Sequence, residues 1–561
     1  MHLPRRRQEP ADRRRHHQGA FRAALGGRRR VTVDALVDAY LAHHLHFRPV
    51  DASFMGLTGH DHRLPPAGPD TAAAERAGLA TLREQLAATP AGETPGQRLD
   101  RRYVEAELTL TEAALDHAPR LANPAWYSGE AAFGIISLLL PHPGPPRGDA
   151  IAARLAAIPA FLAAAEAQLT AAPRAITDRA IRESASFAGY LRTEIRRHYD
   201  WNPAWDAAAD TAAAAFDRFA AAIAHLADAP AATGRAYLAL LMTSAHGLDF
   251  TPETALARAE ADYARLGDEL IALAKANDPA RSWQEQVASL SAMTAETPET
   301  VIDLYRKLDA KAVAGALDLV TPATEYALEY RLLSPDLTQI AADLYFLPYR
   351  SPPAANPGTG SLYWVQPPAG ADYLAANAVA PVKIIHAVHH GSIGHHTQNA
   401  RARTAPSRMA RLAGTDCALG LAMLPAGTMV EGWACYAQDL MAEAPGFYSA
   451  TERVFLKQFE RRNAASVIVD IRLHTGEWSP EQAMDFYASA GFAPSRIAAE
   501  VTRNAMLPAT RLMYWLGIAA IRTLRRRWRG TTAAFHDTLI GHGHVPIAWA
   551  ADEMALKGQL D

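Results

Sequence analysis

The chain is poor in cysteine and has no long hydrophobic run, and each absence excludes a class of protein. Its 561 residues include only two cysteines, Cys417 and Cys435, too few for the disulfide framework of a small secreted protein. No stretch approaches the roughly 18 consecutive apolar residues of a membrane-spanning helix. An apolar segment followed by a small-residue cleavage site, the mark of a secretory signal, is not visible either. We therefore expect a cytoplasmic protein without a membrane partner.

Positive charge is concentrated at the start of the chain. Residues 1–30 hold ten arginines against Glu9 and Asp12, a net charge of +8, so the remaining residues carry about −11 of the total of −3. A block of this kind is typical of a solvated, disordered tail. Because no folded nucleic-acid-binding module surrounds the arginines, we expect no nucleic-acid partner.

Helical patterns dominate the rest of the sequence. Apolar residues recur at three- and four-residue spacing, and alanine, the best helix former, is abundant. Thr251-Pro252 and Ser479-Pro480 each place a capping residue ahead of a proline at the first helical position. The clearest predicted helices cover 71–88, 96–118, 148–172, 252–276 and 479–491.

Breaks in these patterns define the expected organisation of the chain. Proline and glycine concentrate at 141–148 and 347–360, and aromatic and β-branched residues predict one strand within 361–368. The sequence therefore predicts a mainly α protein with a small β element near the middle. We expect an N-terminal helical half over 31–350 and a C-terminal half over 351–561, which together form one continuous catalytic unit.

Histidine is concentrated in one short segment. Five of the 22 histidines lie within the eleven residues 386–396, HAVHHGSIGHH. Neutral imidazole is the commonest metal ligand, and convergence on one ion is the usual reason to concentrate it. If the first part is helical, His386 and His390 share a face at i, i+4, and His395 or His396 approaches from beyond the glycine-containing turn. The alternative for any single histidine is a polar group of the core or surface.

A further ligand is expected from another element. Residues 427–444 have an apolar helical stripe, and Glu431 stands in it between Val430 and Gly432. A carboxylate in such surroundings is costly to bury unless it is paired or bound to a cation. Glu431 is therefore the candidate that joins the histidines, and a salt bridge to an arginine is the alternative.

The segments HHGSIGHHTQ and EGWACYAQ together resemble the bacterial family called domain of unknown function 885. Its members carry His-Glu-x-x-Pro-Gly-His-His-x-Gln followed by Glu-Gly-Trp-Ala-x-Tyr. The family is regarded as zinc peptidase-like and mainly helical, related to the thermostable-carboxypeptidase and oligopeptidase class of metallopeptidases. The resemblance implies that fold and a bound Zn²⁺ or another divalent ion. Further likeness lies, in order along the chain, at 48–65, 123–131, 363–368, 469–483, 500–517 and 535–546.

The resemblance also implies roles for individual residues. By position, His389, His395 and Glu431 become the metal ligands, with one coordination position open for water or substrate. Arg503 matches an arginine suited to a substrate carboxylate or a developing oxyanion. Tyr514 matches a tyrosine that would donate a hydrogen bond to the oxyanion.

The sequence departs from the family pattern beside the first ligand. The family glutamate is His390 here, the family proline is Ile393, and Thr510 stands at a family glutamine. In hydrolases of this type that glutamate takes a proton from the attacking water and gives it to the leaving amine. His390 is then the candidate proton shuttle, since imidazole moves protons near neutral pH. His474 is a candidate for the site or for the residues that support it.

Three functions are compatible with these residues. The first is a metal-dependent hydrolase of a small amide, peptide-like or ester substrate. The second is a metal-dependent lyase or isomerase in which histidines act as acid and base without an attacking water. The third is a non-catalytic relative that binds a metal or small molecule. If His386 and His390 are the ligands instead, the site again lacks its ordinary base.

Overall fold

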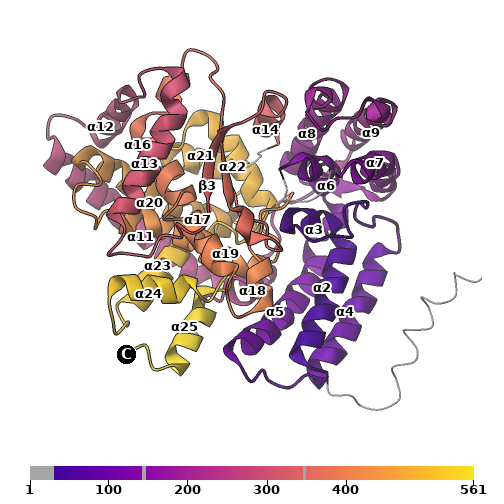
Figure 1. The fold of residues 1–561 in the computed structure, drawn as a ribbon, viewed down its shortest axis with the longest axis horizontal. Helices are drawn as coiled ribbons and strands as arrows, with labels where there is room; N and C mark the ends of the chain where they lie inside the picture. Colours follow the sequence, from indigo (N-terminus) through magenta and orange to yellow (C-terminus); the bar gives the residue numbers. More distant parts are fainter. Residues whose placement is uncertain (1–30, 142–146, 345–348, 419) are drawn as a thin grey trace, which may run out of the picture.

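The structure, a computed structural model, describes residues 31–141, 147–344, 349–418 and 420–561, and α-helices make up most of it (Figure 1). The arginine-rich residues 1–30, for which we predict a disordered tail, lie outside the described residues. The helices of the N-terminal part are α2 (Val33–Phe47), α3 (Pro49–Met55), α4 (Thr71–Ala88), α5 (Pro95–His117), α6 (Pro124–Leu139), α7 (Gly148–Gln168), α8 (Arg174–Arg192) and α9 (Asp206–Ile223).

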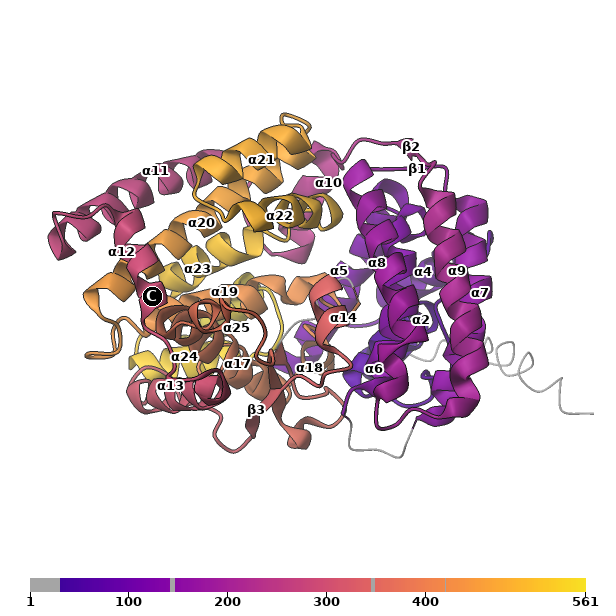
Figure 2. The ribbon, with the colours of Figure 1, turned by 90° about the horizontal axis from the view of Figure 1, so that it is seen from above.

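The later helices form the other side of the molecule in both views (Figures 1 and 2). They are α10 (Arg235–Leu240), α11 (Pro252–Asn277), α12 (Trp283–Ser289), α13 (Val301–Gly315), α14 (Thr338–Asp343), α15 (Tyr373–Ala376), α16 (Val379–Pro381), α17 (His395–Ala402), α18 (Arg408–Leu412), α19 (Gly427–Leu440), α20 (Ala450–His474), α21 (Pro480–Ser489), α22 (Pro494–Met506), α23 (Leu512–Arg525), α24 (Thr532–Ile540) and α25 (Ile547–Leu556).

Short strands and non-α helices complete the described chain. Strands β1 (Ala171–Ala172) and β2 (Ala227–Asp228) pair in parallel. In a second sheet β5 (Ser361–Val365) lies between β3 (Leu328–Leu332), parallel to it, and β4 (Tyr349–Arg350), antiparallel to it. The 3₁₀ helices are η1 (Arg120–Ala122), η2 (Glu194–Arg197), η3 (Pro203–Trp205), η5 (Leu290–Ala292), η6 (Pro298–Thr300), η7 (Pro357–Thr359) and η9 (Leu424–Ala426), and the π-helices are η4 (Leu241–Ala245) and η8 (Val382–His390). The prediction of a mainly α protein is therefore confirmed.

Local sequence explains several helix boundaries. The hydroxyl of Thr251 accepts a hydrogen bond from the backbone N–H of Thr254 at 3.3 Å, and α11 begins at Pro252. Ser479 accepts from the N–H of Gln482 at 3.3 Å in the same way, ahead of α21. Each side chain satisfies a backbone N–H that the first turn leaves unpaired, which fixes where the helix starts.

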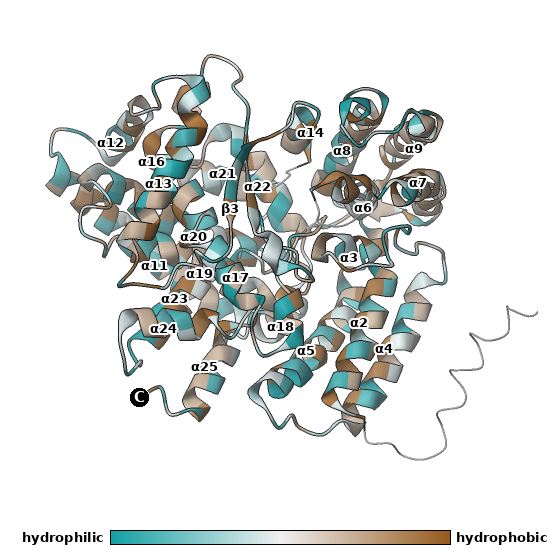
Figure 3. Cartoon of the chain, viewed as in Figure 1, coloured by the Kyte–Doolittle hydropathy of each residue, from teal (hydrophilic) through white to brown (hydrophobic). Residues whose placement is uncertain are grey.

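The N-terminal helices have their own hydrophobic core. Helices α6, α7, α8 and α9 pack together, and their side chains form a cluster separate from the large central one. Helix α7 is long and apolar enough to cross a membrane, the one such helix among the described residues. Leu155, Ile158 and Leu162 of α7 are fully buried in this cluster, so one face of this apolar helix belongs to the core (Figure 3).

Helices α19 and α23 approach each other closely. A Cβ on Gly432 would lie 2.9 Å from the Cα of Gly517, so only glycine at these two positions allows this backbone contact. Glu431 precedes Gly432 on α19, and Tyr514 lies one turn before Gly517 on α23. The close packing therefore holds Glu431 and Tyr514 on neighbouring elements.

Candidate metal centre

The histidine segment consists of a π-helix, a tight turn and the first turn of α17. The predicted helix over His386–His390 is present as the end of η8, with π rather than α geometry. π-Helices are rare and frequently occur at functional sites. At the turn, a Cβ on Gly394 would collide with the carbonyl oxygen of His389, so glycine is needed there. The turn consequently returns the chain directly over η8 and brings His395 beside His389.

Two neighbouring elements hold this turn in place. The indole Nε1 of Trp433, on α19, donates to the carbonyl oxygens of Ile393 and Gly394 at 3.1 and 3.2 Å. Asp309, on α13, accepts from the N–H and the hydroxyl of Ser392 at 2.8 and 2.7 Å. Trp433 lies two residues after Glu431, so the same helix positions the turn and the carboxylate.

Three of the predicted ligands converge. The Nε2 atoms of His389 and His395 lie 3.5 and 3.7 Å from Oε2 of Glu431. These separations are longer than ordinary N–H···O hydrogen bonds. Ligands about 2.0–2.1 Å from a tetrahedral zinc lie about 3.3–3.4 Å from one another. The observed spacing therefore suits a shared cation better than direct hydrogen bonds.

Glu431 is a buried carboxylate that protein groups leave incompletely satisfied. Its Oε2 is inaccessible to solvent and has no hydrogen-bond partner among the described residues. Burial alone raises its pKa, but His389 and His395 outweigh this and lower the pKa to about 2. Burial lowers the pKa of His395 to about 4, so that imidazole is neutral at pH 7. An ionised carboxylate beside neutral imidazole is the protonation state that a divalent metal ion requires.

His390 belongs to the same cluster. One potential ligand atom from each of His389, His390 and His395 lies within 4.8 Å of the other two. Nδ1 of His390 donates to the carbonyl oxygen of Ile385 at 3.0 Å, which leaves Nε2 as the nitrogen available to an ion or substrate. The position of His390 is compatible with a proton shuttle and with a further ligand.

The other two histidines of the segment have partners within the fold. The hydroxyl of Tyr363 hydrogen-bonds Nδ1 of His386, whose ring also stacks on Tyr305 at a centroid distance of 5.3 Å. His396 uses both nitrogens, with Nδ1 2.8 Å from the Ser361 hydroxyl and Nε2 3.1 Å from the Tyr326 carbonyl oxygen. These contacts tie the segment to the β-sheet and occupy both nitrogens of His396.

Arg503 and Tyr514 lie within electrostatic range of Glu431. The positive charge of Arg503 contributes to lowering the pKa of Glu431. Burial, followed by the negative charge of Glu431, raises the pKa of Tyr514 well above its usual value. The hydroxyl of Tyr514 therefore stays protonated at neutral pH and can donate a hydrogen bond.

His474 lies apart from the cluster and is fully buried. Its Nε2 donates to the carbonyl oxygen of Asn504 at 2.8 Å, and its Nδ1 lies 3.2 Å from the hydroxyl of Thr233. Both ring nitrogens of His474 therefore have hydrogen-bond partners. One of these partners, Asn504, is the residue directly after Arg503. His474 thus supports the end of α22 that carries Arg503.

The sequence patterns did not indicate two residues that shape the site. Tyr349, on β4, stacks on His395 at a centroid distance of 5.8 Å and an interplanar angle of 18°. The thiol of Cys435 lies 3.8 Å from Nδ1 of His389. Cys435 lies one turn after Glu431 on α19, so helical spacing was an available signal. Tyr349 lies within the proline- and glycine-rich break at 347–360, where no periodic pattern marks it.

Comparison with known proteins identifies a family and several solved structures of similar fold, two of which are described here. The model of a family described as a bacterial protein of unknown function, DUF885, matches residues 49–554. A candidate lipoprotein of unknown function from Shewanella oneidensis is 17% identical, with a TM-score of 0.75 over 93% of this chain and 99% of its own. A candidate lipoprotein from Colwellia psychrerythraea is 16% identical, with a TM-score of 0.71 over 94% of this chain and 99% of its own. No curated protein is significantly similar. At these identities the two structures establish a shared fold alone.

Proposed function

The chain belongs to the bacterial family of unknown function DUF885, and we propose that this member is a metal-dependent hydrolase of a small amide, peptide-like or ester substrate. Zn²⁺ is the favoured ion, because two imidazoles and one carboxylate match a common catalytic zinc set. We also propose that the fold is related to that of the thermostable-carboxypeptidase and oligopeptidase class of metallopeptidases.

One observation carries this proposal. Oε2 of Glu431 is buried, forms no hydrogen bond of ordinary length with the described residues, and lies 3.5 and 3.7 Å from two imidazole nitrogens. An uncompensated buried charge is strongly destabilising. A cation between the three groups would supply the missing partner for the carboxylate.

The surrounding residues supply the other elements of hydrolysis. When bound, the ion would polarise a carbonyl oxygen and assist ionisation of water. Arg503 can bind a substrate carboxylate or the developing oxyanion through its planar fork. Tyr514 can donate its hydroxyl to the same oxyanion. His390 faces the cluster and is the nearest candidate for moving a proton.

A lyase or isomerase is the second candidate, and His390 is the observation that favours it. An additional imidazole stands where hydrolases of this type have their catalytic glutamate, and it adds no negative charge to the site. Imidazoles beside a metal ion can remove and return a substrate proton without an attacking water. Product analysis in ¹⁸O-labelled water separates the two reactions, since only hydrolysis places solvent oxygen in the product.

The first experiment is metal analysis of the purified protein. The hydrolase proposal expects about one equivalent of zinc or a similar ion, and loss of activity after chelation that added Zn²⁺ restores. A folded, metal-free protein that takes up no zinc on titration would contradict the proposal. Such a result would favour a non-catalytic small-molecule-binding relative.

The cellular location of the protein stays a prediction. The sequence favours the cytoplasm, whereas the two similar structures are described as candidate lipoproteins. Fractionation of cells that produce the full-length chain distinguishes these locations. The metal site proposed above is compatible with either.

A further inference from the structure

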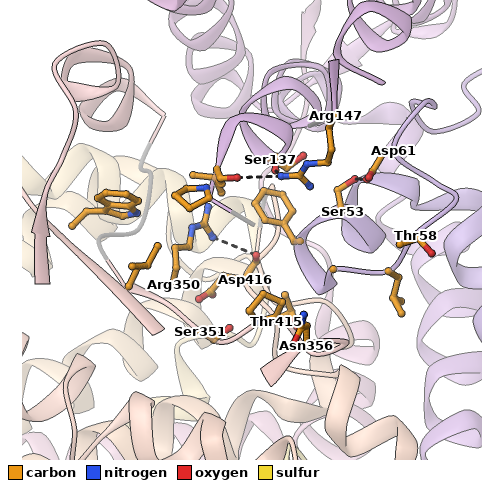
Figure 4. A pocket seen from close by; sticks show the side chains of 18 residues that line it. Ser53, Thr58, Asp61, Ser137, Arg147, Arg350, Ser351, Asn356, Thr415 and Asp416 are labelled. Carbon is orange, nitrogen blue, oxygen red and sulfur yellow. Dashed lines mark hydrogen bonds between the residues drawn. The ribbon is translucent and has the colours of Figure 1, made fainter. Parts of the chain in front are cut away.

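Strands β4 and β5 have one face toward the histidine segment and the other toward a cavity. The cavity has a volume of about 350 Å³, and none of the three proposed metal ligands lines it (Figure 4). On β4, Tyr349 packs on His395, whereas the next residue, Arg350, lines the cavity. On β5, the same alternation places Ser361 beside the histidine segment and Leu362 in the cavity wall. Because successive side chains of a strand point to opposite faces, β4 presents Tyr349 to the metal centre.

The ring of Tyr349 contacts two imidazoles of the candidate metal centre. Its centroid lies 5.8 Å from that of His395, with an interplanar angle of 18°, and 6.5 Å from that of His390, with an angle of 29°. Both separations are within the range of about 4.5–7 Å over which aromatic rings attract one another. Tyr349 is buried, with 2% of its surface exposed. A fixed ring that lies nearly parallel to His395 restricts the rotation of this imidazole.

A hydrogen bond does not provide this restraint at His395. Its Nδ1 is buried and has no hydrogen-bond partner among the described residues. In metal sites the outer nitrogen of a ligating histidine usually donates to a carboxylate, a carbonyl oxygen or water, which fixes the orientation of the ring. Nδ1 of His389, by contrast, lies 3.8 Å from the thiol of Cys435. The orientation of His395 therefore depends on ring packing.

A directed chain of hydrogen bonds holds Tyr349 itself. Burial lowers the pKa of His396, so this imidazole is neutral at pH 7. Its Nε2 donates to the carbonyl oxygen of Tyr326 at 3.1 Å, since a carbonyl oxygen can only accept. Nδ1 of His396 is then an acceptor, and the Ser361 hydroxyl donates to it at 2.8 Å. The Tyr349 hydroxyl in turn donates to Oγ of Ser361 at 3.1 Å. The ring is thereby anchored to the main chain.

We propose that Tyr349 is the positioning residue for His395. Its ring holds the imidazole in the orientation in which Nε2 lies 3.7 Å from Oε2 of Glu431, and the chain through Ser361 and His396 holds the ring. This inference rests on the metal site of the hydrolase proposed above. It gives His396, whose nitrogens both have partners in the fold, a part in the same site. Because Tyr349 acts through a ligand, its first effect is on metal affinity.

Tyr349→Leu removes the ring and keeps an apolar side chain. The full-length, metal-free variant is titrated with Zn²⁺ in competition with a chromophoric chelator. We expect the Kd for zinc to rise at least about tenfold, as for loss of an outer contact of a metal ligand. The visible absorption of the Co²⁺-loaded protein should also change, because it depends on the ligand geometry. A purely structural role would lower the melting temperature and leave the Kd and the spectrum unchanged.

Tyr349→Phe is the conservative variant, since it keeps the ring and removes the hydroxyl. It should retain most of the zinc affinity and the wild-type Co²⁺ spectrum. Ser361→Ala breaks the hydrogen-bond chain that the hydroxyl belongs to. Because both changes remove the same hydrogen bond, the double variant should bind zinc no more weakly than Ser361→Ala alone.

Arg350→Met is the matched control on the same strand. It changes the neighbour of Tyr349 that faces the cavity (Figure 4), so the Kd for zinc should stay close to the wild-type value. An equal loss of affinity in Arg350→Met and Tyr349→Leu would overturn the inference, because the effect would then belong to β4 as a whole.

The remaining outcomes separate this inference from the proposed function. If the wild-type protein binds zinc and Tyr349→Leu binds it within about threefold, against the roughly tenfold loss expected, Tyr349 does not position His395. If Tyr349→Leu fails to fold, the pair Tyr349→Phe and Ser361→Ala decides, and additive losses in the double variant would contradict the hydrogen-bond chain. A wild-type protein that takes up no zinc overturns the metal-dependent function and this inference together.

Discussion

Two buried glutamates, Glu431 on α19 and Glu130 on α6, show how neighbours decide the state of a carboxyl group. In each of them, Oε2 is inaccessible to solvent and has no hydrogen-bond partner among the described residues. Burial and then the charge of Asp51 raise the pKa of Glu130 to about 8, and Arg120 opposes them only in part. His389 and His395 instead lower the pKa of Glu431 to about 2.

The difference assigns different roles to the two side chains. At pH 7 Glu130 is mainly neutral, so its unpaired oxygen carries no charge that needs a counterion. Glu431 is charged, and its nearest neighbours are imidazole nitrogens able to share a cation with it. Burial of a carboxylate alone therefore does not indicate a metal site, whereas burial beside convergent imidazoles does.

Glu431→Gln should have the largest effect on metal content. The amide keeps the shape of the side chain but removes the ligand charge, so we expect zinc to fall from about one equivalent to below about 0.1 after dialysis. Elemental analysis of the purified proteins measures this. Glu130→Gln is the matched control, a change of the same kind at a buried position, and it should keep its zinc. Equal loss in both variants would remove the distinction between the two glutamates.

His390→Ala should abolish turnover and spare the metal. If His390 moves a proton or contacts substrate, its loss costs about 100-fold or more in kcat, while His389, His395 and Glu431 still hold the ion. Hydrolysis of 4-nitrophenyl acetate and elemental analysis are the measurements. A variant that loses its zinc shows His390 to be a ligand and changes the assigned set.

Glu130→Gln should alter the pH dependence of stability. The pKa of Glu130 is raised in the folded state, so the folded protein binds the extra proton and the stabilisation is complete below about pH 4.5. It is lost as pH rises toward about 8. The melting temperature of the variant relative to wild type should therefore rise between pH 5 and pH 8. A constant difference over this range would show that Glu130 is ionised throughout.

Deletion of residues 1–30 should have the smallest effect. Neither glutamate site involves this segment, so we expect unchanged zinc content and a change in melting temperature below about 1 °C. Differential scanning calorimetry and elemental analysis of the shortened chain provide the test. A large loss of stability would show that the arginine-rich segment belongs to the fold.

The sequence predicted those features that depend on neighbouring residues or on a motif. Helix α4 covers 71–88 as expected, and the caps at Thr251 and Ser479 are formed. Periodicity and capping act within one or two turns, so one sequence contains the necessary information. The resemblance selected His389, His395 and Glu431, which the fold brings together.

The remaining features depend on contacts between distant segments. The spacing of apolar residues in the sequence does not predict that η8 is a π-helix rather than an α-helix. The contact between Gly394 and the His389 carbonyl, which brings His395 back over η8, is a property of the folded turn. Sequence spacing carries no information on such packing.

The most direct test of the central claim is a crystal structure with diffraction recorded on both sides of the zinc absorption edge. We predict one anomalous peak about 2.0–2.2 Å from Nε2 of His389, Nε2 of His395 and a carboxylate oxygen of Glu431. A zinc-soaked crystal with no peak there, or with a peak held by other residues, would contradict the account.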